Sequence, residues 1–233
     1  MSDRAILMQF AAPTQSWDGQ RAALRGDDAL STSVKRGRLA SPPTATGIAG
    51  LLGAALGRPR TDGPRLFSPE LADLRELDML VRIDQPGRSR NEFRVTRRRS
   101  STGRTVPQLL VETVLDDAVF LVGVAGPSRQ LLDEIEYALT HPRYALYLGK
   151  REFPPCRPIL IAGVDQSIDR AVREHEWIAG MPWRRRMEMS LTLRTYRPLP
   201  RRRDDGQFVR EPDVLIHNPA GVERPRVDWL SAL

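Results

Sequence analysis

Hydrophobic residues are grouped along this chain in runs of strand length and in stripes with helical spacing. Five runs predict β-strands, at residues 5–10, 76–83, 108–115, 118–125 and 159–164. The run "AVFLVGVA" (118–125) contains no polar residue, so it predicts a strand that is buried on both faces. Asp116 and Asp117 separate it from the preceding run, and two adjacent aspartates at such a place predict a hairpin turn.

Two segments carry apolar residues at helical spacing. The first follows two prolines, with Thr44 or Thr46 as its N-cap and an apolar stripe at positions 48, 51, 52 and 55. Gly57 predicts its C-terminal end, since a proline follows two residues later. The second helix is predicted to begin at Ser128 and to end before Pro142.

The order of these elements is strand, helix, strand, strand, helix, strand. This order is typical of the split βαβ, ferredoxin-like fold that RNA-recognition motifs also use, so we expect an α+β domain over residues 1–165. A β-hairpin arm is expected to protrude from it at about residues 84–115. After residue 166 the chain is charged, then alternates at 187–196, which predicts a small β-rich C-terminal domain over 166–233.

Glycines recur through the first predicted helix, at positions 47, 50, 53 and 57. Each interior glycine costs up to about 1 kcal/mol relative to alanine, so the row requires a reason. One is tight packing of the helix on the sheet. The other is an RNA backbone that crosses the helix N-terminus near Thr46 and Gly47, where free N–H groups attract phosphate.

Positive charge is concentrated in one segment. The net charge is +7 and the sequence pI about 10.4. Residues 85–104 hold seven arginines and one glutamate, so they carry +6 and the remaining 213 residues only +1. Such a distribution is typical of a polyanion-binding element, although a solvated loop is the alternative.

Arg97, Arg98 and Arg99 are consecutive, so in an extended strand Arg98 faces away from the other two. Arg104 lies near the tip.

A second basic cluster lies in the long segment after the first strand. It consists of Lys35, Arg36 and Arg38. Trp17 precedes this cluster and could stack on a base, although an aromatic residue after a first strand is more often part of the core.

Catalytic and metal-binding patterns are weak. The three histidines are far apart, without a second ligand at metal spacing, so we expect no metal and no cofactor. The single cysteine, Cys156, lies between prolines and suits a reducing cytoplasm. The chain opens without a charged and apolar leader, and its longest weakly polar run is too short to span a membrane. His141, Tyr144 and Lys150 could serve a metal-independent ribonuclease, but their spacing is not diagnostic.

Three stretches, taken in order, resemble the corresponding sequences of the CasD family, whose members are subunits of the type I-E CRISPR Cascade complex. They are "LMQFAAPTQSW", "PPTATGIAGLLGAALG" and "HPRYALYLGKREFPPCRPI", and they anchor roughly the first 165 residues. The resemblance implies a ferredoxin-like body whose protruding thumb hairpin corresponds to residues 84–115. It also implies a protein that holds the 5′ handle of CRISPR RNA, contacts the CasC backbone and large CasA subunits, meets target DNA only indirectly, and does not cut.

The resemblance and the charge pattern together suggest a set of RNA contacts. The expected RNA-binding residues are Lys35, Arg36, Arg38, Thr46, Gly47, Arg97, Arg98, Arg99, Arg104, Tyr144, Lys150 and Arg151, with Trp17 for possible base stacking. Relatives in type I-C systems cleave precursor RNA, which is the alternative function. Residues 11–57 contain Lys35 but no histidine or tyrosine, and this composition disfavours the enzyme.

Overall fold

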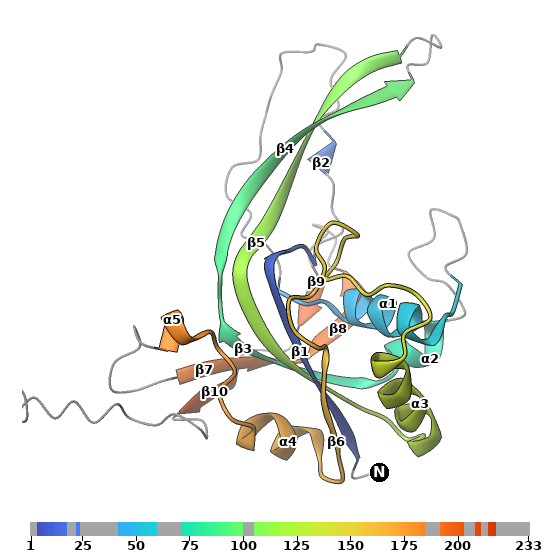
Figure 1. Cartoon of the computed structure of the whole chain (residues 1–233), viewed down its shortest axis with the longest axis vertical. Coiled ribbons are helices and arrows are strands. Elements are labelled where there is room, and N and C mark those ends of the chain that lie inside the picture. Colours follow the sequence, from blue (N-terminus) through green and yellow to red (C-terminus); the bar gives the residue numbers. More distant parts are fainter. Residues whose placement is uncertain are drawn as a thin grey trace, which may run out of the picture.

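The fold is an antiparallel β-sheet with helices on both faces and a long two-stranded arm that leaves the body (Figure 1). This computed structural model describes residues 4–17, 22–23, 42–59, 71–99, 105–184, 192–202, 208–210 and 214–217. Among the helices of these residues, none is long and apolar enough to cross a membrane.

The strands of the described segments form one large sheet and one small one. They are β1 (Ala5–Gln15), β2 (Ala22–Ala23), β3 (Asp78–Gln85), β4 (Arg88–Arg99), β5 (Thr105–Ala125), β6 (Leu160–Val164), β7 (Thr192–Tyr196), β8 (Pro198–Arg202), β9 (Phe208–Arg210) and β10 (Val214–His217). The large sheet has the order β10-β7-β3-β5-β1-β6, and β2 and β4 also pair with β5. The small sheet consists of β8 and β9.

Alternation along β1 builds a core on each face of the sheet. Ile6, Met8 and Phe10 belong to the core that includes α1 (Ala45–Leu56) and α3 (Arg129–Thr140). Their neighbours Ala5, Leu7 and Ala11 belong to the core that α4 (Ile168–Glu174) covers. Successive side chains of a strand point to opposite faces, so a strand that is apolar on both faces, as β1 is at residues 5–8 and 10–12, requires cover on both sides. The two remaining helices are short: α2 (Ala72–Arg75) and α5 (Met181–Arg184).

Both predicted helices are confirmed, with their caps. The Thr44 hydroxyl accepts a hydrogen bond from the Gly47 N–H at the start of α1, and Gly57 ends the helix in the left-handed conformation, with φ 74°. Ser128 caps α3 in the same way through the Leu131 N–H. Local capping signals therefore placed both helices correctly.

The predicted turn at Asp116 and Asp117 is wrong, because both residues lie inside β5, a continuous strand of 21 residues. The outer part of β5 pairs with β4 to form the arm, and the inner part pairs with β1 and β3. Asp117 has a φ of 54°, and the β3–β5 register shifts between Ile83 and Gln85. The extra residue at this shift is Asp84 of β3, opposite Val119 and Phe120, and the positive φ of Asp117 lies two residues further along β5 towards the arm, so the ladder is irregular where the strand enters the body but the strand does not end. The expected protruding arm is present, built from β4 and β5.

The segment after residue 166 contributes strands, but β7 pairs with β3 of the large sheet, and β10 pairs with β7. The boundary between residues 165 and 166 stays a prediction. Strand pairing nevertheless connects the two sides of that boundary in one sheet.

Candidate nucleic-acid interface

The three stretches of the sequence that resembled one family meet in space. The end of β1 joins the loop after α3 through a hydrogen bond from the Ser16 N–H to the Leu148 carbonyl, at 3.2 Å. It joins the start of α1 through a bond from the Thr44 hydroxyl to the Trp17 carbonyl, at 3.4 Å. The helix N-terminus and the loop with Lys150 therefore flank the same end of β1.

Trp17 lies in the core, so the prediction that it stacks on a base is wrong. Its side chain is 4% exposed, and its ring stacks on Phe10 with centroids 4.9 Å apart. Its indole N–H donates to the Gln15 side chain at 2.9 Å, so its single polar group is already paired inside the protein. A Cβ on Gly47 would lie 2.9 Å from the Trp17 ring, which gives Gly47 a packing role.

The N-terminus of α1 is suited to an anion. Its first turn contains no acidic residue, and the helix dipole concentrates positive charge there. Thr46 is partly exposed in this turn. The N–H of Gly47 is already bonded to the Thr44 cap, so Thr46 is the better placed of the two predicted contacts.

The loop after α3 carries two basic residues side by side. Lys150 is half-buried with its ammonium 5.7 Å from the centre of the Phe153 ring, and Arg151 is exposed. Phe153 closes the loop, because its N–H donates to the Lys150 carbonyl and its own carbonyl accepts from Leu148. Tyr144 is 54% exposed, but its N–H bonds the Ala54 carbonyl in the last turns of α1, at the other end of that helix from Thr46.

The backbone of this loop requires a glycine at position 149. Its φ is 95°, and a Cβ at this position would overlap the Ser16 carbonyl. We expect Gly149→Ala to destabilise the fold by about 1–3 kcal/mol, the range for a residue held in strained backbone. Gly50→Ala is the matched control, because its Cβ would meet nothing within 4 Å and alanine favours a helix. In urea unfolding, the midpoint should fall for Gly149→Ala and rise slightly for Gly50→Ala, relative to the parent protein. Equal midpoints for the two variants would contradict this account.

The arm is the second part of the candidate interface. Arg97 is exposed on β4, which continues to Arg99, and the side chains of Arg98 and Arg99 lie outside the described part of the chain, so their facing stays a prediction. Phe93 and Val95 are 63% and 73% exposed, which sequence reasoning missed. The signal was two apolar residues at alternate positions of an otherwise polar strand. Lys35, Arg36, Arg38 and Arg104 lie outside the described residues.

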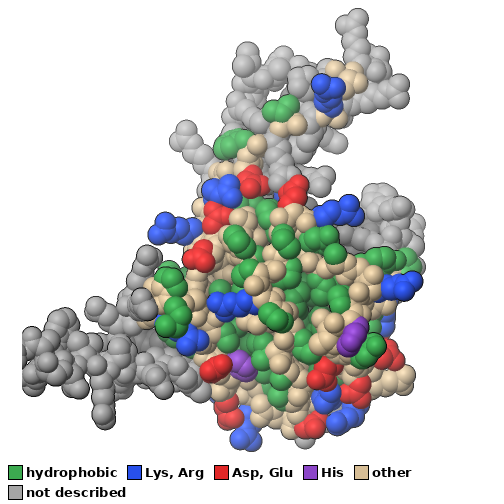
Figure 2. Space-filling model, viewed as in Figure 1, with side chains coloured by type: hydrophobic (Ala, Val, Ile, Leu, Met, Phe, Trp, Pro, Cys, Tyr) green, Lys and Arg blue, Asp and Glu red, His purple; other side chains and the backbone are tan. Residues whose placement is uncertain are grey.

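Charged side chains of both signs gather where the arm leaves the body (Figure 2). Arg90 of β4 holds Asp116 of β5 with contacts of 2.5 and 3.1 Å, and the Thr14 hydroxyl donates to the same carboxylate at 2.9 Å. The hydrogen bond from Arg90, followed by that from Thr14, lowers the pKa of Asp116 below its ordinary value, against the opposing effect of burial.

This lowered pKa predicts a pH dependence. A carboxyl whose pKa is lower in the folded state stabilises the fold above its unfolded pKa, about 3.9, and this contribution is lost as the pH falls through the folded value. We expect Asp116→Asn to destabilise the protein most near neutral pH and progressively less below about pH 4. Unfolding curves of both proteins at several pH values measure this difference, and a constant difference would contradict it.

The described residues contain no group of three or more His, Cys, Asp or Glu side chains that could hold a metal ion. His141, a candidate base for the alternative enzyme, follows the last turn of α3. Its ring stacks on Tyr137 with centroids 4.4 Å apart, and its Nδ1 lies 2.9 Å from the Thr140 hydroxyl.

Comparison with known proteins gives one consistent result. Residues 6–218 match the family model described as CRISPR-associated protein (Cas_Cas5). The chain is 28% identical over 188 residues to "CRISPR system Cascade subunit CasD" of Escherichia coli (strain K12), covering 75% of this chain and 78% of that one. It is similar to a solved structure named "Crystal structure of Cas protein", with a TM-score of 0.56, 26% identity, and coverage of 94% and 97%. A chain of a "CRISPR RNA-guided surveillance complex" shares the fold, with a TM-score of 0.63, 22% identity and 95% coverage of each.

Proposed function

Because the chain belongs to the Cas5 family of CRISPR-associated proteins, we propose that it is the subunit of a type I-E surveillance complex that holds the 5′ handle of the CRISPR RNA without cutting it. The observation that carries this proposal is the arm. The segment with a net charge of +6, residues 85–104, contains β4, which pairs along its length with β5 in an arm that projects from the body. Charge arranged in this way can follow a phosphate backbone, and a compact turn could not.

Two regions would share the RNA. Thr46 at the start of α1, with Lys150 and Arg151 in the loop beside β1, would contact handle phosphates and set the register of the RNA. The arm, with Arg97 exposed, would hold the backbone further along. Bases turned away from these phosphate contacts would confer sequence specificity.

The sheet supports a ferredoxin-like body for this role. Four of its strands follow the order β3-β5-β1-β6 with every neighbour antiparallel, and α1 and α3 both belong to the core on one face. Counted within the βαββαβ unit, this order is 2-3-1-4. The exposed Phe93 and Val95 support a protein contact on the arm, and the backbone CasC and large CasA subunits are the proposed partners. We place the protein in the cytoplasm, with target DNA met only through the RNA.

The alternative function is cleavage of precursor RNA, as in type I-C systems. A metal-independent ribonuclease requires a general base close to a cation that stabilises the phosphorane. Trp17 is buried, and the segment 11–57 supplies no histidine or tyrosine near α1. This composition favours binding over catalysis.

Incubation with repeat RNA tests the proposal. The purified protein is mixed in EDTA with an RNA copy of the CRISPR repeat from the same genome, then followed on a denaturing gel and in a filter-binding assay. We expect binding of intact RNA. Cleavage within the repeat that His141→Ala abolishes would establish the alternative, and absence of binding, with the partner subunits present, would exclude the proposed role.

A further inference from the structure

Strand β3 ends in buried polar residues just before the arm begins. Arg82, Asp84 and Gln85 are 0%, 1% and 3% exposed. The guanidinium of Arg82 makes a two-pronged ion pair with Asp84, at 2.7 and 2.8 Å. A buried ion pair is costly to desolvate, so its remaining hydrogen-bonding groups must also be satisfied.

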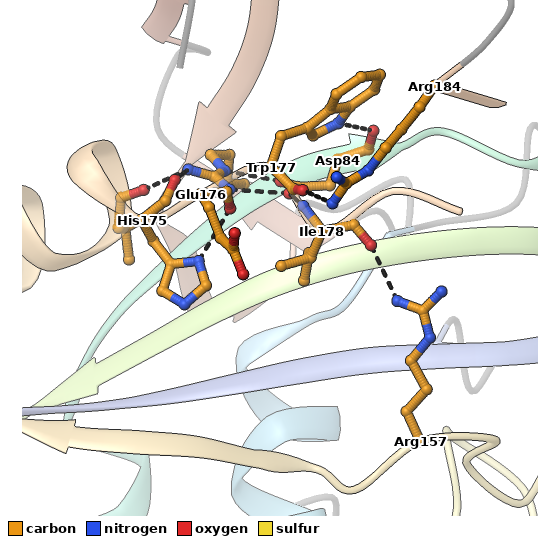
Figure 3. A network of polar contacts seen from close by, with 9 residues as sticks. Asp84, Arg157, His175, Glu176, Trp177, Ile178 and Arg184 are labelled. Atoms are coloured by element: carbon orange, nitrogen blue, oxygen red, sulfur yellow. Dashed lines mark hydrogen bonds and ion pairs between the residues drawn. The ribbon is translucent and has the colours of Figure 1, made fainter. Parts of the chain in front are cut away.

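Those groups bind the segment that follows α4, residues 175–180, which we call the strap (Figure 3). Arg82 donates to the carbonyls of Val172, His175 and Glu176, at 2.7–2.8 Å. Asp84 accepts the Ile178 N–H with its carboxylate at 2.9 Å, and the Trp177 indole N–H with its backbone carbonyl at 2.9 Å. The strap is therefore fixed to β3 by buried, paired groups.

Gln85 extends this connection to the root of the arm. Its side-chain oxygen accepts the Gly180 N–H of the strap at 3.1 Å. Its side-chain amide donates to the Asp117 carbonyl of β5 at 2.6 Å. Asp117 is the residue of β5 with positive φ, two residues beyond Val119, the partner of Gln85 itself. A second glutamine, Gln15 of β1, donates to the next carbonyl, that of Ala118, at 2.7 Å.

The arm meets the body where the backbone is irregular on both strands. Asp117 of β5 and Gly87, just before β4, both have positive φ, at 54° and 70°, and the β3–β5 register shifts nearby at Asp84. Such an irregularity bends and twists a strand locally, so the backbone conformation here sets the direction of the arm. The bend would change with the backbone at Asp117, whose carbonyl is held by the amide of Gln85, and Gln85 is in turn held by the strap.

We propose that Gln85 is a positioning residue that fixes the direction of the arm relative to the body, so that the arm and the body can grip one RNA together. This inference rests on the proposed RNA-holding function. An arm that changes its orientation freely would be in the RNA-binding orientation only part of the time. The apparent affinity for RNA is then the intrinsic affinity multiplied by that fraction of time.

Two substitutions at Gln85 separate its two hydrogen bonds. Gln85→Glu keeps an oxygen for the Gly180 N–H but has no N–H to donate to Asp117. Gln85→Met has a similar volume and removes both bonds. Gln9→Glu is the matched control, because Gln9 also donates to a backbone carbonyl, that of Pro158, but lies on β1 away from the root of the arm.

Distances between spin labels report the arm direction without RNA. Labels are placed at Thr105→Cys on the arm and Ala145→Cys on the body, both exposed positions, in a Cys156→Ser background. Pulsed electron–electron double resonance should give a narrow distribution of label-to-label distances for the parent protein and for Gln9→Glu. We expect a broad distribution for Gln85→Glu and Gln85→Met, together with a dissociation constant for repeat RNA raised about tenfold.

Unchanged distributions in both Gln85 variants would overturn the proposal, and so would a broad distribution with unchanged RNA affinity. If Gln85→Met fails to fold, Gln85→Glu decides the question alone. Loss of the proposed function gives a different result, because the parent protein would then bind no repeat RNA while the distances still respond to Gln85.

Discussion

Replacing Arg97, Arg98 and Arg99 together with alanine is expected to weaken RNA binding on the order of tenfold at low salt and to flatten its salt dependence. Each phosphate that a cation neutralises on single-stranded RNA contributes about 0.7 to the slope of log K against log salt. Three lost contacts should therefore reduce the slope by about 2. Titrations of repeat RNA at several salt concentrations measure both quantities.

The control removes the same charge from the body. Arg129 on α3, with Arg170 and Arg173 on α4, are exposed arginines outside the arm. Their triple alanine variant should lower the affinity less and leave the slope nearly unchanged. Equal slopes in the two triple variants would remove the arm from the RNA interface and leave only a general effect of net charge.

Asp84→Ala is expected to be the most destabilising single substitution among those considered. It leaves the guanidinium of Arg82, which is fully buried, without its counter-ion, and removal of one partner of a buried pair costs about 3–5 kcal/mol. It also removes the acceptor of the Ile178 N–H. Urea unfolding measures the loss, and the strap should become accessible to protease first.

Two comparisons test the cause. Arg82→Met combined with Asp84→Leu removes both charges and should cost less than Asp84→Ala, because no uncompensated charge remains. Glu174→Ala breaks the exposed i,i+4 pair with Arg170 and should cost only about 0.3–0.5 kcal/mol. A loss below about 1 kcal/mol in Asp84→Ala would mean that water reaches Arg82 and that the pair does not hold the strap.

Local sequence signals predicted most of the elements and their caps. Thr44, Ser128 and Gly57 act at the helix ends where capping rules place them, since a cap depends on neighbours within a few residues. The apolar runs likewise predicted β1, β3 and β6, because alternation and burial leave a pattern that needs no knowledge of the partner strand.

Features that depend on distant residues could not be read in this way. Two aspartates between apolar runs are typical of a turn, yet here Arg90, Thr14 and Gln85 bind them or their backbone and keep the strand continuous. The pairing of β7 with β3 joins segments about a hundred residues apart, and nothing local indicates it.

The candidate site shows the same division. The basic arm could be predicted from charge density, and the hairpin is present. Trp17 is of a residue type that often stacks on bases. Only its contacts with Phe10 and Gln15 show that it is part of the core instead. The role of Gln85 has no sequence signature, because a glutamine at a strand end is usually solvated.

The continuity of β5 constrains how the arm can vary among related proteins. One strand serves both arm and body, so a single inserted residue in it would move every later side chain to the opposite face. Length can change freely only at the tip, where adding two residues to each of β4 and β5 lengthens the arm by about 7 Å and keeps both faces. We expect natural arms to differ in even steps, with an odd residue tolerated only where the backbone is already irregular, near Asp117 at the root of the arm.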